Sequence, residues 1–183
     1  MKRVVITGIG AVTAFGKTWE DVKAAFQRKQ NAVQAKTEWA ERYPELGANL
    51  GAEIHDYNPP AHWNRKQLRS LGRVSQFAVE AAELALASAN LLDENGIILP
   101  YLKEGTMGVA CGSSTGSTND VRDAAELLMT GKSDGFNANT YVRMMPHTTA
   151  ANIGIFFGLT GRIIPTSSAC SSGSQGIGSV SYT

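Results

Sequence analysis

The spacing of apolar and polar positions predicts strands and helices that alternate along the chain. Three short runs are rich in β-branched or other apolar residues, and each ends at glycine or serine. Short apolar runs with such ends are typical of buried strands in α/β domains. These strands are expected at residues 2–10, 106–111 and 162–166. Helical periodicity predicts helices at residues 18–29, 72–90, 119–129 and about 147–158. The repeated order of strand, turn and helix predicts an α/β fold.

Local signals support two of these helices and leave one region irregular. Thr18 is a good N-cap for the first helix, with Asp21 three positions on. The run after Gly72 is rich in alanine and apolar on most sides, so its helix should be covered on more than one face. Residues 30–63 contain three prolines and a possible short strand at residues 50–54. This stretch is not expected to divide the chain into domains.

Composition limits the classes of partner and compartment. The 183 residues are 43% hydrophobic and 18% charged, which is enough apolar material for a packed core. A net charge of +1 gives no general attraction for nucleic acid or an anionic membrane. No apolar run approaches the roughly 20 residues that cross a bilayer, and residues 1–12 do not resemble a secretory signal. A cytoplasmic protein is expected, and its two cysteines are expected to be free thiols.

Cys170 is the first candidate for chemistry. It directly follows the strand predicted at 162–166 and opens a helix predicted at 171–180. The amide N–H groups and the dipole at a helix N-terminus favour a thiolate, and the same groups can face a developing oxyanion. However, free cysteine is more often a buried small hydrophobe, and Cys111 lies in a similar sequence, ACGSS against ACSSG. The local sequence leaves both thiols open as the nucleophile.

Three glycines, Gly173, Gly176 and Gly178, fall inside the helix that follows Cys170. Each costs a helix about 1 kcal/mol relative to alanine. We therefore expect close backbone contact there, either with another helix or across a dimer axis.

Three blocks of the sequence identify a family. The segments VVITGIGAVTAFG, DYNPPAHWNRKQLRSLGRVSQFAVEAAELAL and GLTGRIIPTSSACSSGSQGIG resemble, in this order, the β-ketoacyl-[acyl-carrier-protein] synthases of fatty-acid elongation, types I and II. The resemblance runs from residue 1 to about residue 178. It implies that Cys170 is the active-site cysteine and that Cys111 has no catalytic role.

The resemblance also implies a fold, a reaction and partners. The fold would be thiolase-like, with two similar halves in an αβαβα layered sandwich, assembled as a homodimer. An acyl chain would pass from the phosphopantetheine of acyl carrier protein to Cys170. Malonyl-carrier would then lose CO2 and attack the thioester in a decarboxylative Claisen condensation. Acyl carrier protein is thus the expected partner, and no bound cofactor or metal is expected.

The family completes its site with two histidines and a lysine from the second half of the fold, and this chain departs from that pattern. None of its three histidines, His55, His62 and His147, lies in a matching motif. For His147, which precedes a predicted helix, a capping or core role is expected. Residues 1–183 are therefore expected to form the amino-terminal half of a condensing-enzyme domain whose carboxy-terminal half is absent. Such a chain should be inactive in condensation by itself, and it should expose apolar surface.

A run of basic residues lies within the second of these three blocks. Arg65, Lys66, Arg69 and Arg73 occur within nine residues without an acidic residue, and 65, 69 and 73 would share one helix face. Such a run is usually a solvated face. The resemblance implies that Arg65, Lys66 and Arg69 dock the acidic carrier protein.

Other functions stay open as alternatives. A polyketide-type ketosynthase shares the same motifs, and a non-catalytic remnant would fold, dimerise or bind carrier protein without turnover. A cysteine hydrolase would use Cys170 with a histidine base. Nucleotide binding is disfavoured because the pattern begun by Gly8 and Gly10 has Thr13 at the third glycine position, so a tight turn is expected there.

Overall fold

The computed structural model describes residues 3–180, which form two compact units. The larger unit comprises residues 3–10 and 59–180, and the smaller unit comprises residues 11–58. The larger unit contains α3 (Arg65–Leu68), α4 (Arg73–Ser88), η2 (Pro100–Lys103), β3 (Val109–Gly112), α5 (Thr118–Thr130), α6 (Ala138–Arg143), α7 (Thr148–Phe157), β4 (Ile163–Thr166), η3 (Ala169–Ser171) and α8 (Ser172–Val180). The smaller unit contains α1 (Trp19–Gln27), β1 (Gln34–Ala35), α2 (Thr37–Arg42), η1 (Pro44–Leu46) and β2 (Leu50–Gly51).

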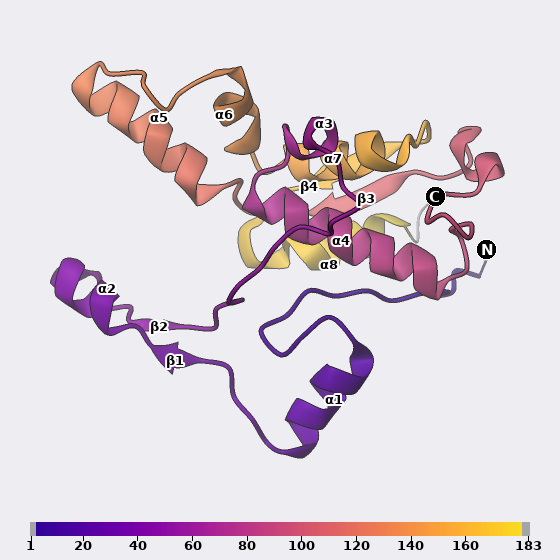
Figure 1. The fold of residues 1–183 in the computed structure, drawn as a ribbon, viewed down its shortest axis with the longest axis horizontal. Helices are drawn as coiled ribbons and strands as arrows, with labels where there is room; N and C mark the ends of the chain where they lie inside the picture. The colour runs from indigo at the N-terminus through magenta and orange to yellow at the C-terminus, as the bar shows by residue number, and fades with distance from the viewer. Residues whose placement is uncertain (1–2, 181–183) are drawn as a thin grey trace. The chain divides into compact units, whose positions relative to one another are not determined.

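A parallel pair of strands forms the centre of the larger unit. β3 and β4 pair in register from Val109 opposite Ile163 to Gly112 opposite Thr166. Both strands contact α7 and α8. Figure 1 shows these two helices on opposite faces of the pair. The parallel pairing and the helices on both faces confirm a mixed α/β architecture.

The core lies between α4, α7 and the strands. Val79 of α4 is fully buried, and Ile153 and Phe157 of α7 pack in the same cluster. A buried polar contact fixes these helices to each other, because Asn152 Nδ2 donates to Ser75 Oγ at 3.0 Å. The predicted helix at 72–90 is thus confirmed as central, and α7 confirms the helix expected near 147–158.

The strand predicted at residues 2–10 is wrong for the described residues 3–10. That segment pairs with no strand in the described part of the chain, and the side chain of Ile6 is 82% exposed. β-branched composition favours extended backbone, but a strand also needs a neighbouring strand to pair with.

The two glycines of this segment serve a close approach to α4 instead of the expected tight turn. A Cβ on Gly8 would lie 2.3 Å from the Ala85 carbonyl oxygen, and one on Gly10 would lie 2.2 Å from the Ala81 carbonyl oxygen. Only glycine allows the backbone to pass α4 at this distance.

Two further differences concern helices. Residues 138–143 form α6 in a region that looks like a polar loop, because Asn137 and Thr140 cap its first turn reciprocally. The expectation that Arg65, Arg69 and Arg73 share one helix face is wrong. α3 ends at Leu68, and Arg73 begins the separate helix α4.

The smaller unit is held by local contacts. Thr18 Oγ1 accepts a hydrogen bond from the Asp21 backbone N–H at 3.1 Å, so the predicted cap and helix are confirmed as α1. β1 and β2 form a short antiparallel pair, with Gln34 opposite Gly51, which confirms a strand near residue 50. An ion pair between Lys36 and Glu53 lies beside this pair and holds the pKa of the Glu53 carboxyl below its usual value.

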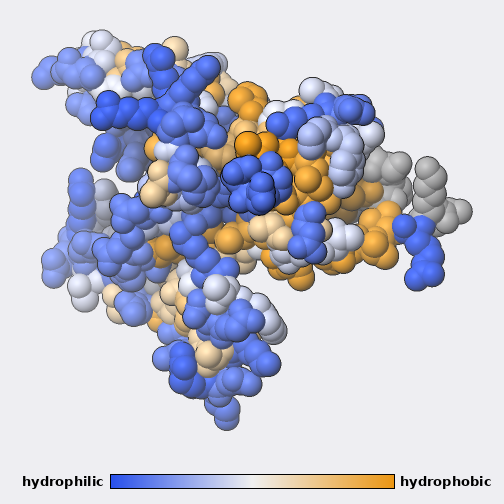
Figure 2. All heavy atoms as spheres, turned by 45° about the vertical axis from the view of Figure 1, so that its right-hand side comes forward, coloured by the Kyte–Doolittle hydropathy of each residue, from blue (hydrophilic) through white to orange (hydrophobic). Residues whose placement is uncertain are grey.

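Apolar side chains reach the surface of the larger unit, as expected. Val5, Ile155 and Ile177 are 68%, 75% and 77% exposed, although each lies in an apolar sequence context. Figure 2 shows orange, hydrophobic residues gathered at the surface in this view. Large contiguous apolar patches are typical of surfaces that contact another part of a protein or another chain.

Candidate active site

Cys170 lies on a short turn between the end of β4 and the start of α8. The turn is the 3-10 helix η3, and the side chain of Cys170 is exposed to solvent. The residue before it, Ala169, has a φ of 51°, which is uncommon for a residue with a Cβ. Strained backbone at such a position persists only where surrounding contacts hold it. The structure therefore confirms the predicted strand, turn and helix and adds a strained residue next to the thiol.

Hydroxyl groups supply the contacts that hold this turn. Ser172 Oγ, which is buried, donates to the Ala169 carbonyl oxygen at 2.7 Å and accepts from the Ser168 N–H at 2.9 Å. Ser114 Oγ also donates to the Ala169 carbonyl oxygen, at 2.6 Å. Thr166 Oγ1 donates to the Ser172 carbonyl oxygen at 2.7 Å, which ties the end of β4 to the first turn of α8.

The first turn of α8 rests on the end of β3. A Cβ on Gly112 would lie 2.0 Å from the Ser172 carbonyl oxygen, so only glycine fits there. Farther along α8, a Cβ on Gly176 would lie 3.2 Å from the Gly112 backbone nitrogen. Close backbone approach is found at Gly176, but its partner is the strand β3 and not the predicted helix or dimer axis. A Cβ built on Gly173 or Gly178 would meet no described atom within 4 Å apart from neighbouring residues and the backbone of α8 itself, so the described residues give no steric reason for glycine at these two positions.

Cys111 has a different environment. It lies in the middle of β3, is partly buried and packs against the core cluster around Val79. Burial raises the pKa of its thiol above the ordinary value. A thiol that is held neutral is a poor nucleophile. The geometry therefore favours Cys170 over Cys111, which the local sequence left equal.

Two of the three histidines lie beside glutamate side chains. His62 Nε2 lies 2.8 Å from Glu83 Oε1, and His55 Nδ1 lies 4.0 Å from Glu53 Oε2. His147 occupies the N-cap position of α7, but its side chain is exposed and makes no capping hydrogen bond. The expected capping or core role of the His147 side chain is therefore wrong.

The basic residues Arg65, Lys66 and Arg69 are all exposed. Asn64 and Gln67 form a capping box that fixes the short helix α3, which carries Arg65 and Lys66 and has Arg69 as its C-cap. The Arg69 carbonyl oxygen accepts from Arg143 Nη1 at 3.4 Å, and Arg143 forms a salt bridge to the buried Asp120 at 2.7 Å.

The basic residues and the cysteine turn are linked through the loop after β3. The Ser117 N–H donates to the Arg143 carbonyl oxygen at 2.9 Å, while Ser114 of the same loop contacts Ala169. Sequence reasoning missed Ser114, Asp120 and Arg143. For Ser114, the only local signal is the serine-rich sequence SSTG that follows β3.

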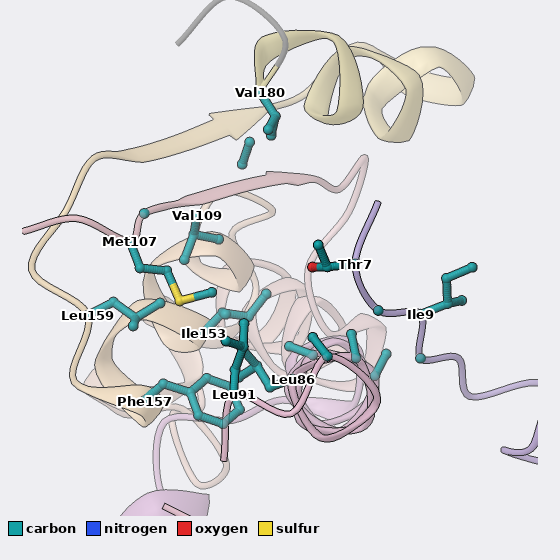
Figure 3. Close-up of a pocket in the computed structure, with 18 of the residues that line it drawn as sticks. Thr7, Ile9, Leu86, Leu91, Met107, Val109, Ile153, Phe157, Leu159 and Val180 are labelled. Atoms are coloured by element: carbon teal, nitrogen blue, oxygen red, sulfur yellow. The ribbon is translucent and has the colours of Figure 1, made fainter. Parts of the chain in front are cut away.

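A separate apolar cavity of about 670 Å³ lies in the larger unit. Figure 3 shows Leu86, Met107, Val109, Ile153 and Phe157 pointing toward it. The described residues that line the cavity include no titratable side chain, so Cys170 does not line it. Its lining is predominantly apolar.

Residues 3–180 contain no candidate metal site and no candidate membrane-spanning helix. No group of three or more His, Cys, Asp or Glu side chains is arranged to hold a metal ion. No helix in this range is long and apolar enough to cross a membrane.

An exposed cysteine at the turn between a parallel strand and a helix is a place where a nucleophilic thiol can act, and comparison with known proteins specifies the family. The family model described as "Beta-ketoacyl synthase, N-terminal domain" matches residues 1–181. The chain therefore belongs to the β-ketoacyl synthase family.

Individual relatives agree with this. A β-ketoacyl synthase structure from Burkholderia phymatum STM815 has 47% identity and a TM-score of 0.89, and the match covers 98% of this chain and 42% of that one. Nodulation protein E of Rhizobium meliloti is 31% identical over 97% of this chain and 42% of its own length. The 3-oxoacyl-[acyl-carrier-protein] synthase 2 of Synechocystis sp. is 25% identical over 97% of this chain and 41% of its own length. The chain thus spans about two fifths of these relatives.

Proposed function

We propose that this chain carries the acyl-accepting part of a β-ketoacyl-[acyl-carrier-protein] synthase, with Cys170 as the nucleophile. The observation that carries the proposal is the exposed thiol on the strained turn between β4 and α8, within a chain that belongs to the family. The contrast with Cys111, whose burial raises its pKa, supports the choice of thiol. The fold proposed for the whole protein is the five-layered thiolase-like sandwich.

The first step is transfer of an acyl group to the cysteine. The Cys170 sulfur attacks the carbonyl carbon of an acyl thioester carried on phosphopantetheine. A new C–S bond forms, the old C–S bond breaks, and the thiol proton of Cys170 ends on the departing phosphopantetheine sulfur. No bound cofactor is needed, because the substrate brings its own thioester.

The second step is condensation. Malonyl-carrier loses CO2, and the resulting carbanion attacks the acyl-Cys170 carbonyl carbon. A C–C bond forms, the bond to sulfur breaks, and Cys170 is released. Stabilising the carbanion requires groups that the resemblance assigns to two histidines and a lysine. His55, His62 and His147 match none of these, so residues 3–180 supply the first step only.

The partner proposed for both steps is acyl carrier protein, docked on Arg65, Lys66 and Arg69. A polyketide synthase neighbour, AntDE:AntF, is described as a ketosynthase in complex with its acyl-carrier protein; it is 19% identical with a TM-score of 0.72, which supports the fold alone. Charge supports the docking surface, because three exposed cations lie together without an acidic neighbour in sequence. We also propose a cytoplasmic homodimer as the working form.

The test is acyl uptake from a small acyl thioester by purified variants. Cys170→Ala should abolish covalent uptake, whereas the matched variant Cys111→Ala should retain it. Uptake that survives in Cys170→Ala and disappears in Cys111→Ala would overturn the proposal. Full uptake in both variants would contradict Cys170 as the acceptor that the reaction requires.

A further inference from the structure

The peptide group that precedes Cys170 is held by hydroxyls from two distant parts of the chain. The Ala169 carbonyl oxygen accepts two hydrogen bonds. One comes from Ser172 Oγ, in α8, at 2.7 Å, and the other comes from Ser114 Oγ, in the loop after β3, at 2.6 Å. The two hydroxyl oxygens lie 3.3 Å apart, so both approach the same carbonyl from neighbouring positions.

This arrangement bears directly on the cysteine because of peptide geometry. The Ala169 carbonyl and the Cys170 N–H belong to one planar peptide group and point in opposite directions. Hydrogen bonds that fix the carbonyl therefore fix the direction of the Cys170 N–H and the position of its Cα. They also polarise the peptide, which makes that N–H a stronger donor.

The Ala169 backbone needs such support. Its φ of 51° lies in the left-handed region, which is unfavourable for alanine by roughly 1–2 kcal/mol. Without the hydroxyls the turn would relax toward ordinary φ and rotate the peptide group. Ser172 is buried and also accepts from Ser168, so it serves the fold of the turn. Ser114 is exposed, and its hydroxyl donates to the Ala169 carbonyl oxygen and lies 3.3 Å from Ser172 Oγ.

We infer that Ser114 is a positioning residue for acyl transfer, because its hydroxyl holds the Ala169–Cys170 peptide in the orientation that the reaction uses. The inference rests on the proposed function of Cys170. Ser114 touches neither the thiol nor the acyl group, so it acts only through the peptide. Its neighbour Ser113 offers a matched control, since Ser113 Oγ donates to the Thr115 carbonyl oxygen at 2.8 Å instead.

The experiment measures the rate of Cys170 acylation by a small acyl thioester in Ser114→Ala, Ser113→Ala and Ser114→Thr, with the purified protein. Loss of one hydrogen bond of ordinary strength predicts a rate about 3- to 10-fold lower in Ser114→Ala. Ser113→Ala should match wild type, and Ser114→Thr should restore the rate because it returns a hydroxyl. Thermal unfolding of all three variants should stay close to wild type, because Ser114 is exposed.

Three outcomes would overturn the inference: an unchanged rate in Ser114→Ala, an equal loss in Ser113→Ala, or no recovery in Ser114→Thr. Failure of the proposed function itself looks different. In that case wild-type protein would show no acyl group on Cys170, whatever residue stands at position 114.

Discussion

At the scale of single residues, the two thiols are distinguished by their surroundings. Cys170 is exposed on a turn, whereas Cys111 is partly buried in β3 and its pKa is raised by burial. The sequence alone could not separate them, because ACGSS and ACSSG offer the same local pattern. What separates them is packing against the core, which only the three-dimensional arrangement shows.

A limiting dose of iodoacetamide should therefore label Cys170 before Cys111 near neutral pH. Labelling of Cys111 should rise as the pH is raised past the ordinary range of a cysteine, because its thiolate forms only above a raised pKa. The pKa of Cys111 is higher in the folded protein than in the unfolded chain. The free energy of unfolding should therefore be unaffected by this thiol below the unfolded-chain pKa, and it should decrease as the pH rises through the folded-state pKa. Peptide mapping by mass spectrometry at several pH values measures both sites, and earlier labelling of Cys111 at neutral pH would contradict the assignment.

Ser114 shows a limit of sequence reasoning at the same scale. It lies 55 residues from Ala169 in the chain, and its hydroxyl reaches that carbonyl only because β3 and β4 are parallel neighbours. A serine after a strand has no distinctive pattern of its own. By contrast, the position of Cys170 could be predicted, because a strand, a small-residue turn and a glycine-rich helix are consecutive in the sequence.

At the scale of elements, the helices were predictable and one strand was not. Periodicity and caps lie within each helix, so α1, α4, α5 and α7 appear where the pattern places them. Strand formation at residues 3–10 depends on a pairing partner, which local composition does not contain. α6 was missed because glycine and asparagine near residue 135 resemble a loop, although Asn137 in fact caps the helix.

The close packing of α8 against β3 gives a prediction for Gly112. Gly112→Ala would place a Cβ 2.0 Å from the Ser172 carbonyl oxygen, and this overpacking should lower the free energy of unfolding by about 1–3 kcal/mol. Gly173→Ala is the matched control in the same region. Its Cβ would meet open space among the described residues, and alanine should stabilise the helix by up to about 1 kcal/mol.

Denaturant unfolding curves of the two variants measure this difference. The two substitutions are predicted to have opposite signs. If Gly112→Ala is as stable as wild type, the close packing of Ser172 on β3 is not part of the folded protein.

At the scale of the whole molecule, the docking surface makes a prediction about carrier protein. Lys66→Glu with Arg69→Glu replaces attraction for an acidic partner by repulsion, so carrier binding should weaken mainly through slower association. The difference in association rate between wild type and the double variant should decrease as the salt concentration rises, because exposed charges are screened over about 8–10 Å at physiological ionic strength. Acylation by a small thioester, which needs no docking, should not change.

The matched control is Lys103→Glu with Arg162→Glu. Both residues are exposed cations of the larger unit, and they lie near the amino ends of β3 and β4, away from the cysteine turn. Association rates measured by stopped flow at low and high salt compare the two double variants. Equal carrier binding by both at low salt would show that Arg65, Lys66 and Arg69 form an ordinary solvated surface.

A polypeptide of residues 1–183 alone should accept an acyl group weakly and should form no β-ketoacyl product. Two of its three histidines are within 4.0 Å of glutamates, and none lies in a motif that matches the family's catalytic histidines, so no group that stabilises the carbanion is expected in residues 1–183. Mass analysis of the products formed from acyl and malonyl thioesters checks this. Ordinary condensation product from this polypeptide would contradict the division of the reaction between the two steps.

The most direct test of the central claim is the site of the acyl group itself. Wild-type protein is incubated with an acyl thioester, digested at acidic pH to preserve the thioester, and mapped by mass spectrometry. The proposed function predicts the added acyl mass on the peptide that contains Cys170 and none on the peptide that contains Cys111. An acyl group on Cys111, or a folded protein that carries no acyl group on Cys170, would contradict it.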